Sequence, residues 1–106
     1  MLIVTTPTIE GKKIAQHLGP VFGQCIVGAG SLKSFISGVK DVLGARVIVL
    51  EDEVRHARDM AVRDMIRDAE KLGAQAVVGL CASYDSLAEG QLMLVAVAGT
   101  AVIVEA

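Results

Sequence analysis

Aromatic residues are almost absent from this chain of 106 residues, which has two phenylalanines, one tyrosine and no tryptophan. Hydrophobic residues nevertheless make up 53% of the sequence, so the core must be built from aliphatic side chains and methionine rather than from stacked rings. A chain of this length usually forms one domain. We therefore expect residues 1–106 to fold as a single unit without linkers.

An excess of charge of either sign is also missing, because ten basic and twelve acidic residues leave a net charge of -2. This balance provides no basic stripe for nucleic acid and no polybasic patch for a membrane surface. The apolar part of the last segment, Leu92–Val104, is shorter than the ~20 residues that span a bilayer as a helix. The beginning of the chain does not resemble a secretory signal, so we expect a cytoplasmic protein whose two cysteines are reduced.

Strand signals dominate the first quarter of the sequence. Met1–Thr5 predicts a short strand, which ends before Pro7 because proline has no amide proton for a ladder. Lys13–Gly28 predicts a long strand. Its middle contains residues typical of a bend or bulge, namely Gly19, Pro20 and Gly23.

Two helices are expected in the middle of the chain. The first begins at Ser31 and ends at Gly44, and the second, Glu51–Leu72, ends before Gly73. The second has an apolar stripe at helical spacing, formed by Val54, Ala57, Ala61, Met65, Ala69 and Leu72. Asp68 falls within this stripe, so we expect it to need a partner from a facing element or another subunit.

The C-terminal third predicts a hairpin, with strands at Ala76–Ala82 and Leu92–Val104 and a polar connection at Ser83–Gly90. Side chains alternate along a strand, and in Leu92–Val104 both resulting faces are apolar. Two helices cannot cover both faces of such a sheet. We therefore predict an α+β fold, a two-layer arrangement of an antiparallel sheet on two helices, whose second sheet face is covered by other copies of the chain.

Candidate metal ligands are few and scattered. Cys25, Cys81, His17 and His56 have the side chains that zinc or copper prefers, but none forms a pair at the spacing typical of structural zinc sites. Both cysteines lie among apolar neighbours, which favours small hydrophobic core residues over ligands. Copies of one residue could still meet in an oligomer, so the metal ligands stay unknown.

The remaining polar candidates each have a structural interpretation. Gly28–Ser31 with Lys33 has the start of a phosphate-binding loop but lacks the third glycine of GxGxxG, and a tight turn explains it. His56 with Asp52 or Asp59 fits a solvated helix face. Asp64 and Asp68 could perturb each other, although an ion pair with Arg58 or a neighbouring subunit explains them. No nucleophile comes with a base, so we expect no enzyme, no catalytic residue and no assigned cofactor.

Three stretches carry a resemblance to a known family: VTT at Val4–Thr6, the run at Ala57–Gly79 and AGTAV at Ala98–Val102. Together they resemble the YbjQ-like family, small proteins labelled as putative heavy-metal-binding. The resemblance implies a dodecin-like α+β subunit that assembles into pentamers or pairs of pentamers. The sequence departs from the family pattern at Gln75, at Asp64 and at Ser31–Lys33, where relatives carry asparagine, arginine and basic residues, and this puts any ligand site formed there in doubt.

Three hypotheses follow. The leading one is a cytoplasmic homo-oligomeric ring, a pentamer or decamer, with a binding or scaffold role. The alternative is a module that binds a metal ion or small ligand between subunits. A hydrolase or transferase ranks last because no polar cluster supports it.

Overall fold

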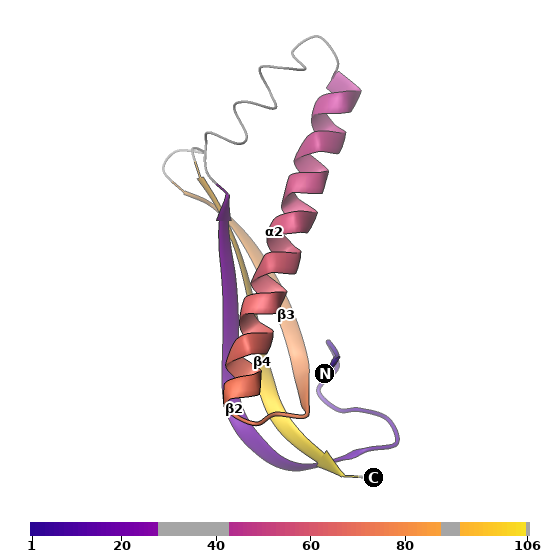
Figure 1. Ribbon diagram of the computed structural model, residues 1–106. Coiled ribbons are helices and arrows are strands. Elements are labelled where there is room, and N and C mark those ends of the chain that lie inside the picture. Colours follow the sequence, from indigo (N-terminus) through magenta and orange to yellow (C-terminus); the bar gives the residue numbers. More distant parts are fainter. Residues whose placement is uncertain (28–42, 88–91, 106) are drawn as a thin grey trace.

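The chain folds into a curved sheet with one long helix packed along it (Figure 1). The structure, a computed structural model, describes residues 1–27, 43–87 and 92–105. In chain order the elements are β1 (Leu2–Ile3), β2 (Lys13–Val27), α2 (Leu43–Lys71), β3 (Ala76–Leu87) and β4 (Leu92–Glu105). The sheet has the order β1-β3-β4-β2, in which β4 is antiparallel to β3 and β2, and β1 pairs in parallel with β3. This arrangement confirms the predicted α+β fold and adds one parallel pair.

Two predicted boundaries are wrong. The long helix begins at Leu43 rather than at Glu51, so Gly44 lies in its first turn instead of ending a helix. The rest of the predicted first helix falls in residues 28–42, outside the described residues. β3 continues to Leu87, so the first half of the predicted polar connection is strand.

The two strands that flank β4, namely β2 and β3, both contain bulges. In β2 the register shifts between Ile14 and Gln16 and again between His17 and Gly19, which confirms the predicted irregularity. Gly19 has a φ of 124°, a conformation that L side chains rarely adopt. β3 has a second irregularity between Val78 and Cys81, where Gly79 has a φ of 65°. The sequence analysis missed this bulge, which bends the sheet next to the N-terminal segment.

The core lies between α2 and the face of the sheet that it covers, here called the inner face. The predicted apolar stripe supplies its buried helix residues, Ala57, Ala61, Met65 and Ala69. Leu72 is the exception, because 47% of it is exposed. The opposing strands contribute Val21, Val77, Val95, Val97 and Ala101.

Small residues let α2 approach the sheet closely. A Cβ atom at Gly23 of β2 would collide with the carbonyl oxygen of Ala61 and would lie 2.6 Å from the amide nitrogen of Met65. Both atoms belong to the helix backbone, which cannot move aside as a side chain can. Glycine at this position therefore sets the distance between α2 and β2.

The helix ends as the sequence predicts. The Gly73 amide donates to the Glu70 carbonyl at 3.0 Å, and the Ala74 amide donates to the Ala69 carbonyl at 3.1 Å. With a φ of 76° at Gly73, this is the Schellman arrangement, which satisfies carbonyls of the last helical turn. The chain then turns directly into β3.

The opposite, outer face of the sheet is only partly covered by the chain itself. Near the two chain ends, Ala76, Val78 and Val102 form a small buried cluster, against which Val4, Ile9, Ile14 and Val104 pack. Hydrogen bonds hold the N-terminal segment there, since the Val4 amide donates to Val77 and the Gly79 amide donates to Thr6, both at 2.9 Å. Whether one chain can cover both faces therefore depends on how exposed the other half of the outer face is.

Candidate functional site

The uncovered half of the outer face is the main candidate site. Register and side-chain alternation place three rows of residues on it, here called the outer patch: Phe22, Ala98 and Cys81; Gln24, Ala96 and Ser83; Ile26, Leu94 and Asp85. Phe22 and Ile26 are 59% and 56% exposed, which is unusual for large apolar side chains. Asp85, in the third row, is the one acidic residue of these nine, and none of them is basic.

A hollow of about 330 Å³ lies at the centre of the outer patch. Its floor is formed by the small residues Ala96 and Ala98 of β4, and its walls come from β2 and β3. Phe22 stands on the β2 side, whereas the β3 side has the smaller Cys81 and Ser83. Phe22 therefore projects from the surface on the β2 side, whereas the small side chains of β4 and β3 leave a depression.

A second feature is the outer edge of β2, along which grooves of about 260 and 270 Å³ separate the strand from α2. The backbone amide of Gln24 points to this edge and donates to the Asp64 carboxylate at 3.2 Å. Asp68 lines both grooves. The Asp64 carboxylate therefore accepts the hydrogen bond of an edge amide that could otherwise pair with a strand of another chain.

The edge of β3 is open over half its length. β1 pairs only with Ala76 and Val77, at the beginning of β3. Within the described part of the chain, no strand lies beside Cys81–Leu87 on the side away from β4. Unpaired edges of this length are a common place for chains to associate.

The four candidate metal ligands do not come together. Cys25 is half-buried and packs against the inner core, as predicted, whereas Cys81 is exposed on the outer patch, so its predicted core position is wrong. His17 on β2 and His56 on α2 are both exposed. Among residues 1–27, 43–87 and 92–105, no three His, Cys, Asp or Glu side chains form a group that could hold a metal ion.

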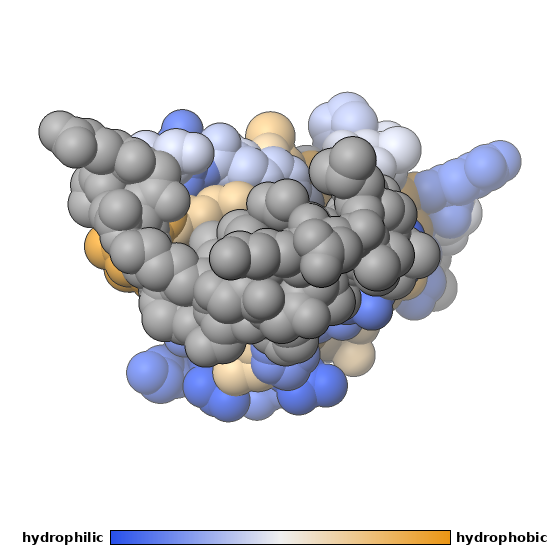
Figure 2. Space-filling view, turned by 90° about the horizontal axis from the view of Figure 1, so that it is seen from above, coloured by the Kyte–Doolittle hydropathy of each residue, from blue (hydrophilic) through white to orange (hydrophobic). Residues whose placement is uncertain are grey.

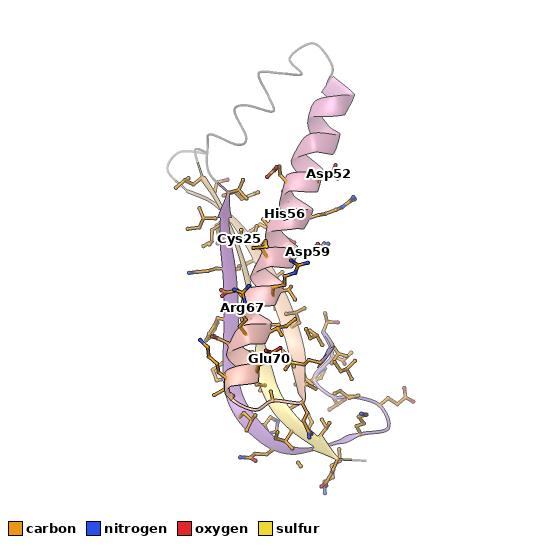
Figure 3. All side chains as sticks on the ribbon, viewed as in Figure 1. Cys25, Asp52, His56, Asp59, Arg67 and Glu70 are labelled. Carbon is orange, nitrogen blue, oxygen red and sulfur yellow. The ribbon has the colours of Figure 1, made fainter. Side chains whose placement is uncertain are left out.

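The acidic and basic candidates on α2 are spread along its length (Figure 3). Asp52 pairs with Arg55 at 3.8 Å and Asp59 pairs with Arg58 at 3.8 Å, so neither carboxylate is reserved for His56. The predicted ion pair of Arg58 with Asp64 or Asp68 is not formed. These helix residues form a solvated face rather than a reaction centre.

Asp68 is exposed, contrary to the expectation that it lies in the buried stripe. It faces the groove at the β2 edge, where the sheet ends and water reaches the helix. The carboxylate therefore needs no partner within the chain. Gly28–Ser31 and Lys33 lie outside the described residues, and their predicted anion site is not tested.

Gln75, one of the departures from the family pattern, has a structural role. Its backbone amide donates to the Val102 carbonyl, and its side-chain oxygen accepts a hydrogen bond from the Val104 amide, both at 3.0 Å. The side chain thus extends the pairing of β3 with β4 beyond Ala76. This position therefore stabilises the end of the sheet.

The sequence analysis missed Phe22 and the hollow beside it. A signal was available in Lys13–Gly28, where Phe22, Gln24 and Ile26 alternate with Val21, Gly23 and Cys25. Seen from above, hydrophobic residues reach the surface at the left margin, and the lower margin is mostly hydrophilic with single hydrophobic residues between (Figure 2). Among the described residues, no helix has the length and apolar character to cross a lipid bilayer.

Comparisons with known proteins agree with the fold and give a family. Over 102 residues the chain is 39% identical to UPF0145 proteins of Geobacillus kaustophilus and of Anoxybacillus flavithermus, and each match covers 96% of both chains. A crystal structure from Pediococcus pentosaceus, a DUF74-family protein of unknown function, matches with a TM-score of 0.62 at 14% identity, covering 99% of this chain and 98% of that one. The family model described as "Putative heavy-metal-binding" matches residues 1–105. The chain therefore belongs to the YbjQ family.

Proposed function

We propose that the protein works as a closed homo-oligomer, a pentameric ring or a pair of such rings, with a binding or scaffold role. The observation that carries this proposal is the outer patch, a largely apolar surface with one acidic residue, on which Phe22 and Ile26 are more than half exposed. Monomeric proteins rarely leave such a contiguous surface in water. Other copies of the same chain would cover it.

The open strand edges support a closed arrangement. β2 and β3 leave edges on opposite sides of the sheet, so a contact between different surfaces of adjacent copies can repeat from copy to copy. A repeated contact of this kind closes into a ring when its rotation divides a full turn. Closure also removes edges that would otherwise invite aggregation.

The cytoplasm is the proposed location, because Cys25 and Cys81 are free thiols and such thiols are typical of reducing compartments. Binding or scaffolding is proposed instead of catalysis because the two carboxylates nearest His56 along α2, Asp52 and Asp59, form exposed ion pairs with Arg55 and Arg58. Gel filtration with light scattering tests the assembly. The expected mass is five or ten times that of one chain, and a stable monomer at micromolar concentration would refute the proposal.

A second candidate function is metal or small-ligand binding between subunits, favoured by the description of the family. The exposed candidates Cys81, His17 and His56 lie on β3, β2 and α2. A site built from them would therefore use side chains of more than one copy. Calorimetric titration with zinc, copper and nickel would give saturable heat with fewer ions than chains, and no heat with an unchanged melting temperature would dispose of this candidate.

A further inference from the structure

We infer that Phe22 of one copy inserts into the hollow of the outer patch of another copy, where it covers Cys81. This inference rests on the proposed homo-oligomer and assigns the residues of a two-fold, face-to-face contact between copies, which joins two rings and is separate from the repeated contact within a ring. The occupant is a second copy of this chain, because the patch contains both a projecting aromatic side chain and a depression that fits one.

The hollow has the size and chemistry for an aromatic ring. Its volume of about 330 Å³ exceeds the roughly 150 Å³ that holds a benzene molecule in a protein interior. The floor consists of Ala96 and Ala98, so a ring would meet methyl groups rather than polar atoms. Phe22 is the most exposed large hydrophobic residue of the described chain, at 59%.

The two parts of the patch are also correctly placed for pairing with themselves. Phe22 and Ile26 lie on β2, and the low side of the patch lies across β4 on β3. When two such sheets face each other with their strands in the same direction, β2 of one copy comes to lie over β3 of the other. The projecting side chains of each copy then fill the low side of its neighbour, as side chains do between packed sheets.

Charge opposes this contact little. Asp85 of β3, opposite Leu94, is the one acidic residue of the outer patch. When β2 of one copy lies over β3 of the other, Asp85 lies over Ile26 of the other copy and not over the second Asp85. The two carboxylates are therefore on opposite sides of the contact.

The inference has a chemical consequence that can be measured at Cys81. This thiol is exposed in the single chain and would be buried beneath Phe22 of a neighbour. Cys25 packs against the inner core and is half-buried with or without assembly. Alkylation by iodoacetamide, followed residue by residue with mass spectrometry, would thus report the contact at Cys81 and provide an internal comparison at Cys25.

The test uses two patch variants and one control. Phe22→Asp removes the inserted ring, and Ala96→Phe fills the hollow from within the same chain. Arg67→Asp is the control, because Arg67 is exposed on α2, away from the outer face of the sheet and from the open edge of β3. Circular dichroism establishes that each variant keeps its secondary structure, and Ala96→Phe keeps the test valid if Phe22→Asp fails to fold.

Both patch variants should weaken association by about thirtyfold or more, as expected for loss of a central aromatic anchor. Cys81 should then react as fast as in a dilute, dissociated sample, while Arg67→Asp keeps the wild-type mass and protects Cys81. The inference is overturned, and the homo-oligomer stands, if the wild type assembles but keeps Cys81 reactive, or if the patch variants keep the wild-type mass. It is also overturned if Arg67→Asp alone dissociates the protein. A wild-type monomer would overturn the proposed function and the inference together.

Discussion

Gly23→Ala is the substitution for which the structure predicts the largest effect from the smallest change. The added methyl group would collide with the Ala61 carbonyl and lie 2.6 Å from the Met65 amide nitrogen. Ordinary van der Waals contacts of carbon begin near 3.5 Å. Since both atoms belong to the backbone of α2, relief requires the whole helix to move away from β2.

The magnitude follows from the cost of overpacking. Extra methyl groups in a packed core usually cost about 1–3 kcal/mol, and two backbone contacts place Gly23→Ala at the upper end. The loss of backbone freedom in the unfolded chain returns only about 0.4–1 kcal/mol. We expect a net loss of about 2–2.6 kcal/mol, which is a large part of the roughly 5–16 kcal/mol available to a chain of this length.

Urea unfolding followed by circular dichroism measures this loss, at one fixed protein concentration because assembly adds to the apparent stability. The midpoint should fall by at least about 1 M. Gly99→Ala is the comparison, since its Cβ would meet a side-chain atom, Val77 Cγ1, at 2.5 Å, and a side chain can shift its rotamer at a cost of about 0.5–1.5 kcal/mol. If Gly23→Ala is no more harmful than Gly99→Ala, the close approach of α2 to β2 is wrong.

Four further substitutions probe individual contacts in the same urea assay. Met65→Ala should cost about 2–5 kcal/mol, because Met65 is fully buried at the centre of the core; a loss below 1 kcal/mol would contradict that position. Asp64→Ala should cost about 1 kcal/mol, since it removes the acceptor of a backbone hydrogen bond from β2. Gln75→Ala should cost a similar amount, about 1 kcal/mol, because its side chain binds the backbone of β4. Lys13→Ala should change stability by less than about 0.5 kcal/mol, because its 4.0 Å ion pair with Glu105 is largely exposed.

The elements that sequence predicted well are those in which one face of a regular period is buried. The stripe from Ala57 to Ala69 repeats at helical spacing and packs on the sheet, and Gly73 ends the helix where a left-handed residue is required. The beginning of α2 was missed because Gly44 is typical of a helix end.

Residues near the edges of the sheet were predicted less well, because periodicity says nothing about where a covering element stops. Asp68 lies within the apolar stripe of α2 but beside the edge of β2, so water reaches it. The polar sequence from Ser83 onward is typical of a loop, although it belongs to β3. Polar residues are tolerated in this part of the strand because α2 packs on β2 and β4 and does not cover it. Cys81 has apolar sequence neighbours, yet it lies on the face that the chain leaves bare.

Assembly and metal binding make competing demands on Cys81. Within one chain Cys25 belongs to the inner core and Cys81 to the outer patch. The two thiols point to opposite faces, so the sheet lies between them. A metal ion must displace water from its ligands and hold a deprotonated thiolate, which requires access to the sulfur. If Phe22 of a neighbour covers Cys81, this access is lost. The exposed candidates that remain among the four predicted metal ligands are then His17 and His56. Protection of Cys81 in the assembled protein would therefore direct the search for a metal site away from the sheet and toward the histidines.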